Sequence, residues 1–126
     1  MSIYGIGTDI ININRIQKAL KNKKFKKKLF SNNEIKIVEN KSNKIASYAK
    51  RFAAKEAFSK ALGTGISGGI LFKDISINNN KKGMPYIELL GKTKTVVKQT
   101  IKKNYKIYLT ISDEKKYAIA MVVITY

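Results

Sequence analysis

The apolar positions of this chain follow first a strand pattern and then a helical one. Residues 3–13 are almost continuously apolar, which predicts a strand. Gly5 and Gly7 interrupt the run, and glycines inside a strand mark a bulge or a close approach of another backbone. Asp9 also interrupts it, either as a turn residue that bonds its own backbone or as a functional acid. Over residues 14–29 apolar side chains recur one helical turn apart, with lysines on the other faces.

Local signals predict two further helices in the middle of the chain. Residues 31–34 read Ser-Asn-Asn-Glu, a capping box that opens a short helix through about Asn40. Ser42 is placed to cap the next helix, which continues to Leu62. Gly63 should end that helix, because glycine adopts the left-handed conformation that helix C-termini favour.

The remaining pattern is that of two hairpins with one helix between them. A loop is expected at residues 66–69, and the later elements are strands 70–77 and 85–90, a helix 92–104, and strands 106–112 and 117–126. No internal repeat or linker interrupts this order. We therefore expect one α+β domain over residues 1–126, with an antiparallel sheet and three to four helices.

One acid lies on the apolar side of the helix that ends at Leu62. At 100° per residue, Ile45, Ala49, Phe52 and Glu56 form a single stripe. An ionised carboxylate costs several kcal/mol to bury without a partner, so Glu56 should face a cation, either a metal ion or Lys60 one turn on. The simpler interpretation is an ordinary Glu-Lys pair on the helix surface.

The charge of the chain points to an acidic partner. The net charge is +18, which suits a nucleic acid, an anionic membrane or an acidic protein. However, 24 of the 26 basic residues are lysine, and Lys, Asn and Ile fill 54 of 126 positions, as A/T-rich codon usage would produce. Arg15 and Arg51 are therefore the more informative cations. A basic nucleic-acid-binding module is the alternative hypothesis, although no aromatic pair on a central strand resembles an RNA-recognition motif.

The absence of two residue types limits the possible chemistry. The sequence has no cysteine and no histidine, which excludes disulfides, thiol nucleophiles, Cys/His zinc sites and imidazole catalysis. An enzyme must then use carboxylates, lysines, hydroxyls or a hard metal ion. No leader pattern and no membrane-length apolar run is evident, so a cytoplasmic protein is expected.

The whole chain resembles the holo-acyl-carrier-protein synthases, the small bacterial members of the 4′-phosphopantetheinyl transferase superfamily. The motifs that carry the resemblance are GIGTDI at 5–10, RFAAKEAFSKALGTGI at 51–66, GMPY at 83–86 and LTISDEKKYAIAMVVI at 109–124. The long block with an acid upstream is the specific signal. The resemblance implies transfer of the phosphopantetheine arm of coenzyme A to a serine of apo acyl carrier protein, as a step of fatty acid biosynthesis.

The resemblance also implies roles for individual residues. Those matching Asp9 and Glu56 bind Mg²⁺, Lys60 reaches the phosphates, and these three form the catalytic set. The coenzyme A pocket is assigned to Arg51, Phe52, Lys60, Thr64, Gly83 and Pro85. Relatives of this size are typically homotrimers, in which a neighbouring subunit completes the pocket.

A basic surface near the N-terminus matches the acidic carrier protein. The resemblance and the charge together assign docking of the carrier to Arg15, Lys18, Lys21 and Lys24. Asp113 departs from several relatives that carry histidine there. Because a carboxylate repels a phosphorylated nucleotide, no nucleotide-binding role is assigned to Asp113.

Overall fold

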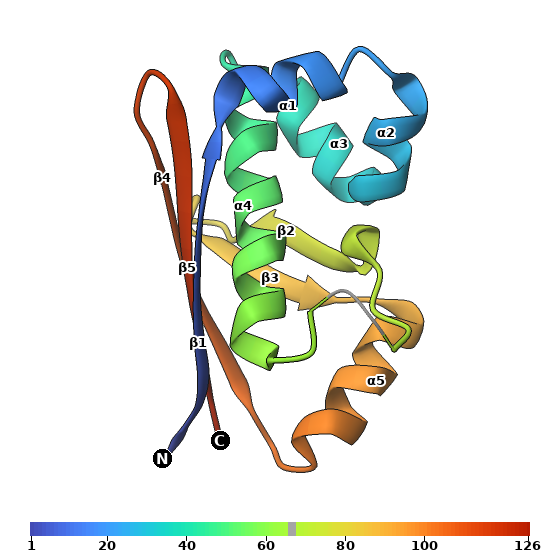
Figure 1. Cartoon of the computed structure of the whole chain (residues 1–126), viewed down its shortest axis with the longest axis vertical. Helices are drawn as coiled ribbons and strands as arrows, with labels where there is room; N and C mark the ends of the chain where they lie inside the picture. Colours follow the sequence, from blue (N-terminus) through green and yellow to red (C-terminus); the bar gives the residue numbers. More distant parts are fainter. Residues whose placement is uncertain (66–67) are drawn as a thin grey trace.

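The computed structural model describes residues 1–65 and 68–126, and it has the predicted α+β architecture with antiparallel sheets (Figure 1). The strands are β1 (Ile3–Asn12), β2 (Ile75–Asn79), β3 (Pro85–Leu89), β4 (Lys106–Asp113) and β5 (Tyr117–Thr125). The helices are α1 (Ile13–Ala19), α2 (Lys23–Leu29), α3 (Asn32–Glu39), α4 (Lys44–Leu62) and α5 (Gly91–Ile101), with a single 3₁₀ turn, η1 (Phe72–Asp74). No helix in the described ranges is long and apolar enough to cross a membrane.

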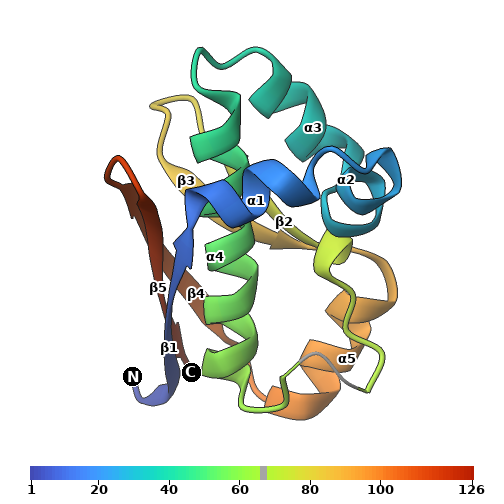
Figure 2. The same ribbon diagram turned by 45° about the horizontal axis from the view of Figure 1, so that its top comes forward.

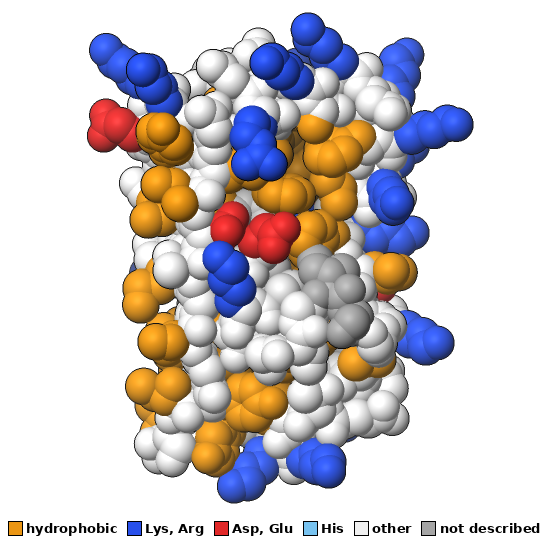
Figure 3. All heavy atoms as spheres, viewed as in Figure 1, with side chains coloured by type: hydrophobic (Ala, Val, Ile, Leu, Met, Phe, Trp, Pro, Cys, Tyr) orange, Lys and Arg blue, Asp and Glu red, His pale blue; other side chains and the backbone are white. Residues whose placement is uncertain are grey.

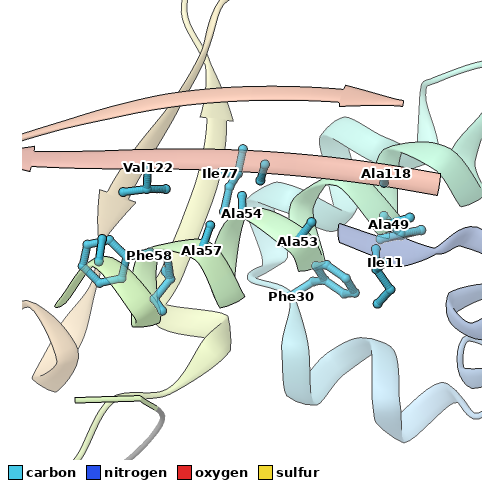
Figure 4. Packing of buried hydrophobic residues seen from close by; sticks show 14 of the residues in the cluster. Ile11, Phe30, Ala49, Ala53, Ala54, Ala57, Phe58, Ile77, Ala118 and Val122 are labelled. Atoms are coloured by element: carbon cyan, nitrogen blue, oxygen red, sulfur yellow. The ribbon is translucent and has the colours of Figure 1, made fainter. Parts of the chain in front are cut away.

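Helix α4 is the element around which the others pack. Figures 1 and 2 show it between a three-stranded sheet on one side and the remaining elements on the other, with α1, α2 and α3 near its start and α5 near its end. Its interior face is made of alanines, which permit close packing. In Figure 4, Ala49, Ala53 and Ala57 lie along the helix beside β5, which carries Ala118 and Val122.

The three-stranded sheet has the order β1-β5-β4, and all its pairs are antiparallel. β1 pairs with β5 continuously from Gly5 to Asn12, after one bulge between Ile3 and Gly5. Asp9 lies inside this continuous strand, opposite Ala120. The predicted interruption at Asp9 is therefore wrong, and so is its interpretation as a turn residue.

The glycines of β1 mark a close approach of two backbones, as predicted. A Cβ atom at Gly5 would overlap the carbonyl oxygen of Ala61, and one at Gly7 would overlap that of Ala57. Only glycine lets β1 lie directly against the backbone of α4 at these two positions. This contact fixes the distance between the two elements that carry Asp9 and Glu56.

Several element boundaries differ from the sequence prediction. The first helical stretch divides into α1 and α2, because the side chain of Asn22 caps a second helix by accepting from Lys24 N. Asn43, and not Ser42, caps α4. β2 begins only at Ile75, because the preceding residues form η1.

Two other predicted boundaries are confirmed, but α5 ends at Ile101 and not at Asn104. Ser31 and Glu34 form the capping box of α3, with both reciprocal hydrogen bonds present. Gly63 ends α4 with a φ of 86°, in the left-handed region. The loop predicted at residues 66–69 falls partly outside the described residues, since residues 66 and 67 are not among them.

Candidate active site

Asp9 faces α4 because of the alternation of β1. Positions 5, 7, 9 and 11 face the same side of the strand. The first two are the glycines that contact α4. The helix therefore lies against the strand just before Asp9. The Asp9 side chain is 17% exposed, so its carboxylate is largely shielded but still open to solvent.

Lys60 contacts β1 instead of its neighbour on the helix. Its Nζ donates to the backbone oxygen of Thr8 at 2.9 Å and to Asp9 Oδ1 at 3.1 Å. The ordinary surface pair between Glu56 and Lys60 is therefore not formed, and the ion pair of Lys60 is with Asp9. The ammonium group stays accessible, because the Lys60 side chain is 55% exposed.

Glu56 is a half-buried carboxylate next to a second carboxylate. Burial raises the pKa of Glu56, the charge of Asp9 raises it further, and Lys60 opposes both effects. Figure 3 shows two acidic side chains side by side over β1 and α4, with a basic side chain beside them. The site has a deficit of positive charge, which a bound cation would correct.

The two carboxylates fit Mg²⁺. Mg²⁺ usually takes one or two protein carboxylates and completes its shell with phosphates and water. Asp9 and Glu56 come from different elements, and their proximity raises the pKa of Glu56. Among the described residues, no three or more His, Cys, Asp or Glu side chains lie close enough together to hold a metal ion. Mg²⁺ that is also bound to a phosphate does not need such a group.

A polar cleft lies near the start of α4. Its volume is about 410 Å³, and its walls come from α4, the turn between β2 and β3, and the end of β4. The residues that line it are Lys41, Ser42, Asn43, Ala46, Ser47, Lys50, Arg51, Asn79, Gly83, Pro85, Ile111 and Asp113. The structure thus brings together three of the residues that the sequence assigned to the coenzyme pocket, Arg51, Gly83 and Pro85.

Arg51 is a buried cation in the wall of this cleft. Only 3% of its surface is exposed, and its Nη2 donates to Asn79 Oδ1 at 2.8 Å. Burial lowers the pKa of Arg51, and the charge of Glu34 opposes that shift. An arginine stays protonated at neutral pH even so, and it can attract an anion into the cleft.

Asp113 lies in the same cleft, and its charge is paired. Lys50 Nζ is 3.0 Å from Asp113 Oδ1, an ion pair between α4 and the end of β4. Lys50 therefore offsets the repulsion that an acid at this position would exert on an anionic ligand. The sequence did not reveal this pair, because its members are far apart along the chain.

Three residues predicted for the coenzyme pocket, Phe52, Lys60 and Thr64, do not line the cleft. Phe52 packs its ring edge-on against Phe72, with centroids 5.6 Å apart. Thr64 is exposed and follows Gly63 at the opposite end of α4. All three assignments stay predictions.

The residues assigned to partner docking form an exposed basic surface on the first two helices. Arg15 and Lys18 lie on α1, Lys24 lies on α2, and Lys21 lies between them. α1 packs on α4 through the buried Ile16. This surface is therefore attached to the helix that carries Glu56.

A buried ion pair was not predicted. Lys55 Nζ lies 2.6 Å from Glu34 Oε1, and neither side chain is exposed to solvent. The signal in the sequence is weak: Lys55 follows Ala53 and Ala54, but the same helix carries Lys50, Glu56 and Lys60. A lysine that becomes buried among small apolar residues needs an acidic partner.

Comparison with known proteins identifies close relatives over the full length. Residues 5–122 match the family model of the 4′-phosphopantetheinyl transferase superfamily. The chain is 48% identical over 125 residues to the holo-[acyl-carrier-protein] synthase of Pelagibacter ubique, covering 98% of both proteins. It is also 48% identical over 127 residues to the synthase of Wolbachia pipientis, covering 97% of both.

Solved structures of such synthases have the same fold. The Bacillus anthracis synthase in complex with CoA (3′,5′-ADP) is similar with a TM-score of 0.80 and 36% identity, over 98% of this chain and 97% of that one. The Helicobacter pylori synthase in complex with coenzyme A gives a TM-score of 0.78 at 36% identity, over 95% and 99% of the two chains.

Proposed function

We propose a function from one premise: this chain belongs to the holo-[acyl-carrier-protein] synthases of the 4′-phosphopantetheinyl transferase superfamily, and it is an enzyme of that class. The proposed reaction transfers the 4′-phosphopantetheine arm of coenzyme A to a serine of apo acyl carrier protein. The serine oxygen forms a bond to the phosphorus that bears the arm, and 3′,5′-ADP leaves. The cluster of Asp9, Glu56 and Lys60 carries this proposal.

Lys60 is suited to contact the phosphates of coenzyme A. Thr8 O and Asp9 Oδ1 take two of its three N–H groups within the described residues and fix the direction of the side chain. The remaining N–H and the positive charge are accessible to a phosphate oxygen. A fixed cation at that position stabilises the negative charge that develops on the leaving 3′,5′-ADP.

Asp9 and Glu56 are proposed to bind Mg²⁺, which when bound would neutralise charge on the phosphoryl oxygens. Glu56 can also accept the serine proton through a water molecule as the new bond forms.

The cleft around Arg51 is proposed to bind the nucleotide end of coenzyme A. Arg51 and Glu56 are five residues apart on α4, about 7.5 Å along the helix axis. That spacing supports binding of the nucleotide at the cleft with the pyrophosphate near Lys60. Arg51 supplies positive charge for the phosphorylated ribose, and Lys50 offsets the charge of Asp113 in the same cleft.

One assay tests the proposed reaction directly. The protein is incubated with coenzyme A, Mg²⁺ and an apo acyl carrier protein, and the carrier is weighed by mass spectrometry. We expect the carrier to gain the mass of the phosphopantetheine arm while 3′,5′-ADP accumulates in equal amount. A carrier of unchanged mass, with the enzyme folded and both substrates intact, would overturn the proposal.

The exposed basic surface of α1 and α2 is proposed to dock the acidic carrier. Complementary charge raises the association rate and sets orientation more than it adds affinity. We expect Arg15→Glu to raise KM for the carrier roughly tenfold at low salt and to leave KM for coenzyme A unchanged. Lys94→Glu on α5 removes a lysine on another face and serves as the control. An equal effect on both KM values would contradict a docking role for Arg15.

The outer face of the three-stranded sheet is proposed to form a homotrimer interface. The large apolar side chains that it exposes are Ile6, Ile10, Tyr108, Tyr117, Ile119 and Met121. Figure 3 shows hydrophobic groups along this edge of the molecule. A sheet face that exposes several large apolar side chains is suited to an interaction site. Closed rotational symmetry would cover the same face in every copy.

Light scattering tests the interface. We expect the parent protein to have the mass of three chains and Met121→Lys to shift it toward one chain, because the lysine would be desolvated at the centre of the face. Leu71→Lys replaces another exposed apolar residue, outside the sheet, and should leave the mass unchanged. A parent protein of single-chain mass would contradict the trimer.

The proposal extends to the wider setting of the enzyme. Residues 1–126 are proposed to act as one transferase domain, and the contacts of α4 with β1, β5, β2 and α3 support this. Cytoplasmic location and a place in fatty acid biosynthesis are further parts of the proposal, and they rest on the resemblance to the synthases.

A further inference from the structure

We propose that Asn79 is a positioning residue that fixes the two walls of the cleft against each other, and through them the nucleotide end of coenzyme A. The inference rests on the proposed function. Asn79 is the last residue of β2, and its side chain lies between α4 and the turn to β3. Its Oδ1 accepts from Arg51 Nη2 at 2.8 Å, and its Nδ2 donates to the backbone oxygen of Gly83 at 2.9 Å.

The two contacts require an amide at this position. A guanidinium group can only donate and a carbonyl oxygen can only accept, so the bridging side chain must offer one acceptor and one donor. Aspartate would keep the contact with Arg51 and turn a second acceptor toward Gly83. Alanine would lose both contacts. The chemistry of the two partners therefore also fixes the orientation of the Asn79 amide.

The turn between β2 and β3 depends on this attachment. β2 and β3 form a sheet of two strands, an arrangement that is marginally stable on its own. Asn80 shapes the turn by accepting from Lys82 N and Met84 N, but these contacts stay inside the turn. Within the described residues, Asn79 is the side chain that hydrogen-bonds to both α4 and the turn.

Arg51 depends on Asn79 for its orientation. The other contact of its guanidinium group is long, 3.4 Å from Nη1 to the backbone oxygen of Ser47. Its buried Nε has no hydrogen-bond partner in the described part of the chain. The 2.8 Å contact with Asn79 is thus the one that fixes the plane of the guanidinium group. Losing it would release the cation and the turn together.

The first test compares two neighbouring asparagines. Asn78 is buried and bonds to a different set of groups, Asn33, Ser76 and Glu88, so Asn78→Ala is a control for the structural cost of losing an amide. We expect Asn79→Ala to raise KM and Kd for coenzyme A about tenfold, as for the loss of a hydrogen bond to a charged group, with kcat at saturation and KM for the carrier unchanged. Asn78→Ala should lower the melting temperature without this change in KM.

The second test needs no coenzyme. Amide hydrogen exchange at Gly83 and Met84 is measured in the ligand-free parent protein, Asn79→Ala and Asn79→Asp. We expect faster exchange in both variants, because each loses the donor to Gly83 O. Unchanged exchange, or a parental Kd in Asn79→Ala, would overturn the inference. If the parent protein itself does not bind coenzyme A, the proposed function fails, and the exchange rates still decide whether Asn79 holds the turn.

Discussion

Glu56→Gln should lose about a thousandfold in transfer rate while the metal-free protein becomes no less stable. Glutamine has the shape of glutamate but no charge, so it cannot neutralise a divalent cation or accept the serine proton. Electrostatic stabilisation by a metal ion supplies several kcal/mol, and about 4 kcal/mol corresponds to a thousandfold in rate. Initial rates with saturating coenzyme A and Mg²⁺ would measure this loss.

The stability of the same variant follows from the pKa of Glu56. The pKa of Glu56 in the folded state lies above its ordinary value of 4.5. At a pH between the ordinary and the raised pKa, the folded state binds more protons than the unfolded state. Stability therefore falls as the pH rises through this window, and ionised Glu56 destabilises the metal-free fold at neutral pH. Glutamine removes that penalty. We expect that, in a metal chelator, the melting temperature of Glu56→Gln rises relative to that of the parent protein as the pH increases from 4 to 8.

Glu39→Gln is the matched control with the opposite sign. A hydrogen bond from Tyr48 lowers the pKa of Glu39, with further help from Lys26 and Lys44. Its stabilising effect is present above pH 4.5 and is lost as the pH falls through its lowered pKa. Glu39→Gln should therefore lose stability at neutral pH and keep its activity. If Glu56→Gln behaved in this way instead, Glu56 would be an ordinary structural carboxylate.

Predictions from the sequence were most accurate for features that depend on neighbouring residues. The N-terminal capping box and Gly63 depend on neighbouring residues, and both boundaries are confirmed. The glycines of β1 correctly predicted a close backbone approach. The alternative of a surface pair between Glu56 and Lys60 is wrong, because helical spacing considers only residues on the same helix. β1 offers Lys60 a backbone oxygen and the Asp9 carboxylate, and both lie more than 50 residues away along the chain.

Adjacent residues of one motif also separated in space. Arg51 and Phe52 are neighbours in the sequence, but their side chains differ by about 100° around the helix. Arg51 is buried toward the cleft, whereas Phe52 packs on Phe72. The same rotation takes Lys55 and Glu56 to different sides of α4, one into the core and one to the half-buried face. The positions of α3 and β1 determine which of these two sides of α4 is fully buried. The spacing within the motif does not contain that information.

Lys55→Met should cost about 3 to 5 kcal/mol of the free energy of unfolding, the cost of removing one partner of a buried ion pair. The ammonium group of Lys55 donates to Glu34 Oε1, Phe72 O and Ile75 O, so its three N–H groups have three acceptors. Glu34 Oε1 also accepts from Ser31 N. This single cation therefore connects α3, α4, η1 and β2. Urea denaturation would measure the loss, which is a large fraction of the 5 to 15 kcal/mol of a typical domain.

The double variant separates charge from packing. Methionine fills nearly the volume of the lysine stem, so most of the cost of Lys55→Met should come from the unpaired charge of Glu34. Adding Glu34→Gln removes that charge and should restore part of the lost stability, although Phe72 O and Ile75 O stay without a donor. Lys44→Met, at an exposed ion pair with Glu39, should cost less than about 1 kcal/mol. A Lys55→Met variant as stable as Lys44→Met would show that the core tolerates an isolated carboxylate at Glu34, in conflict with the cost of burying an unpaired charge.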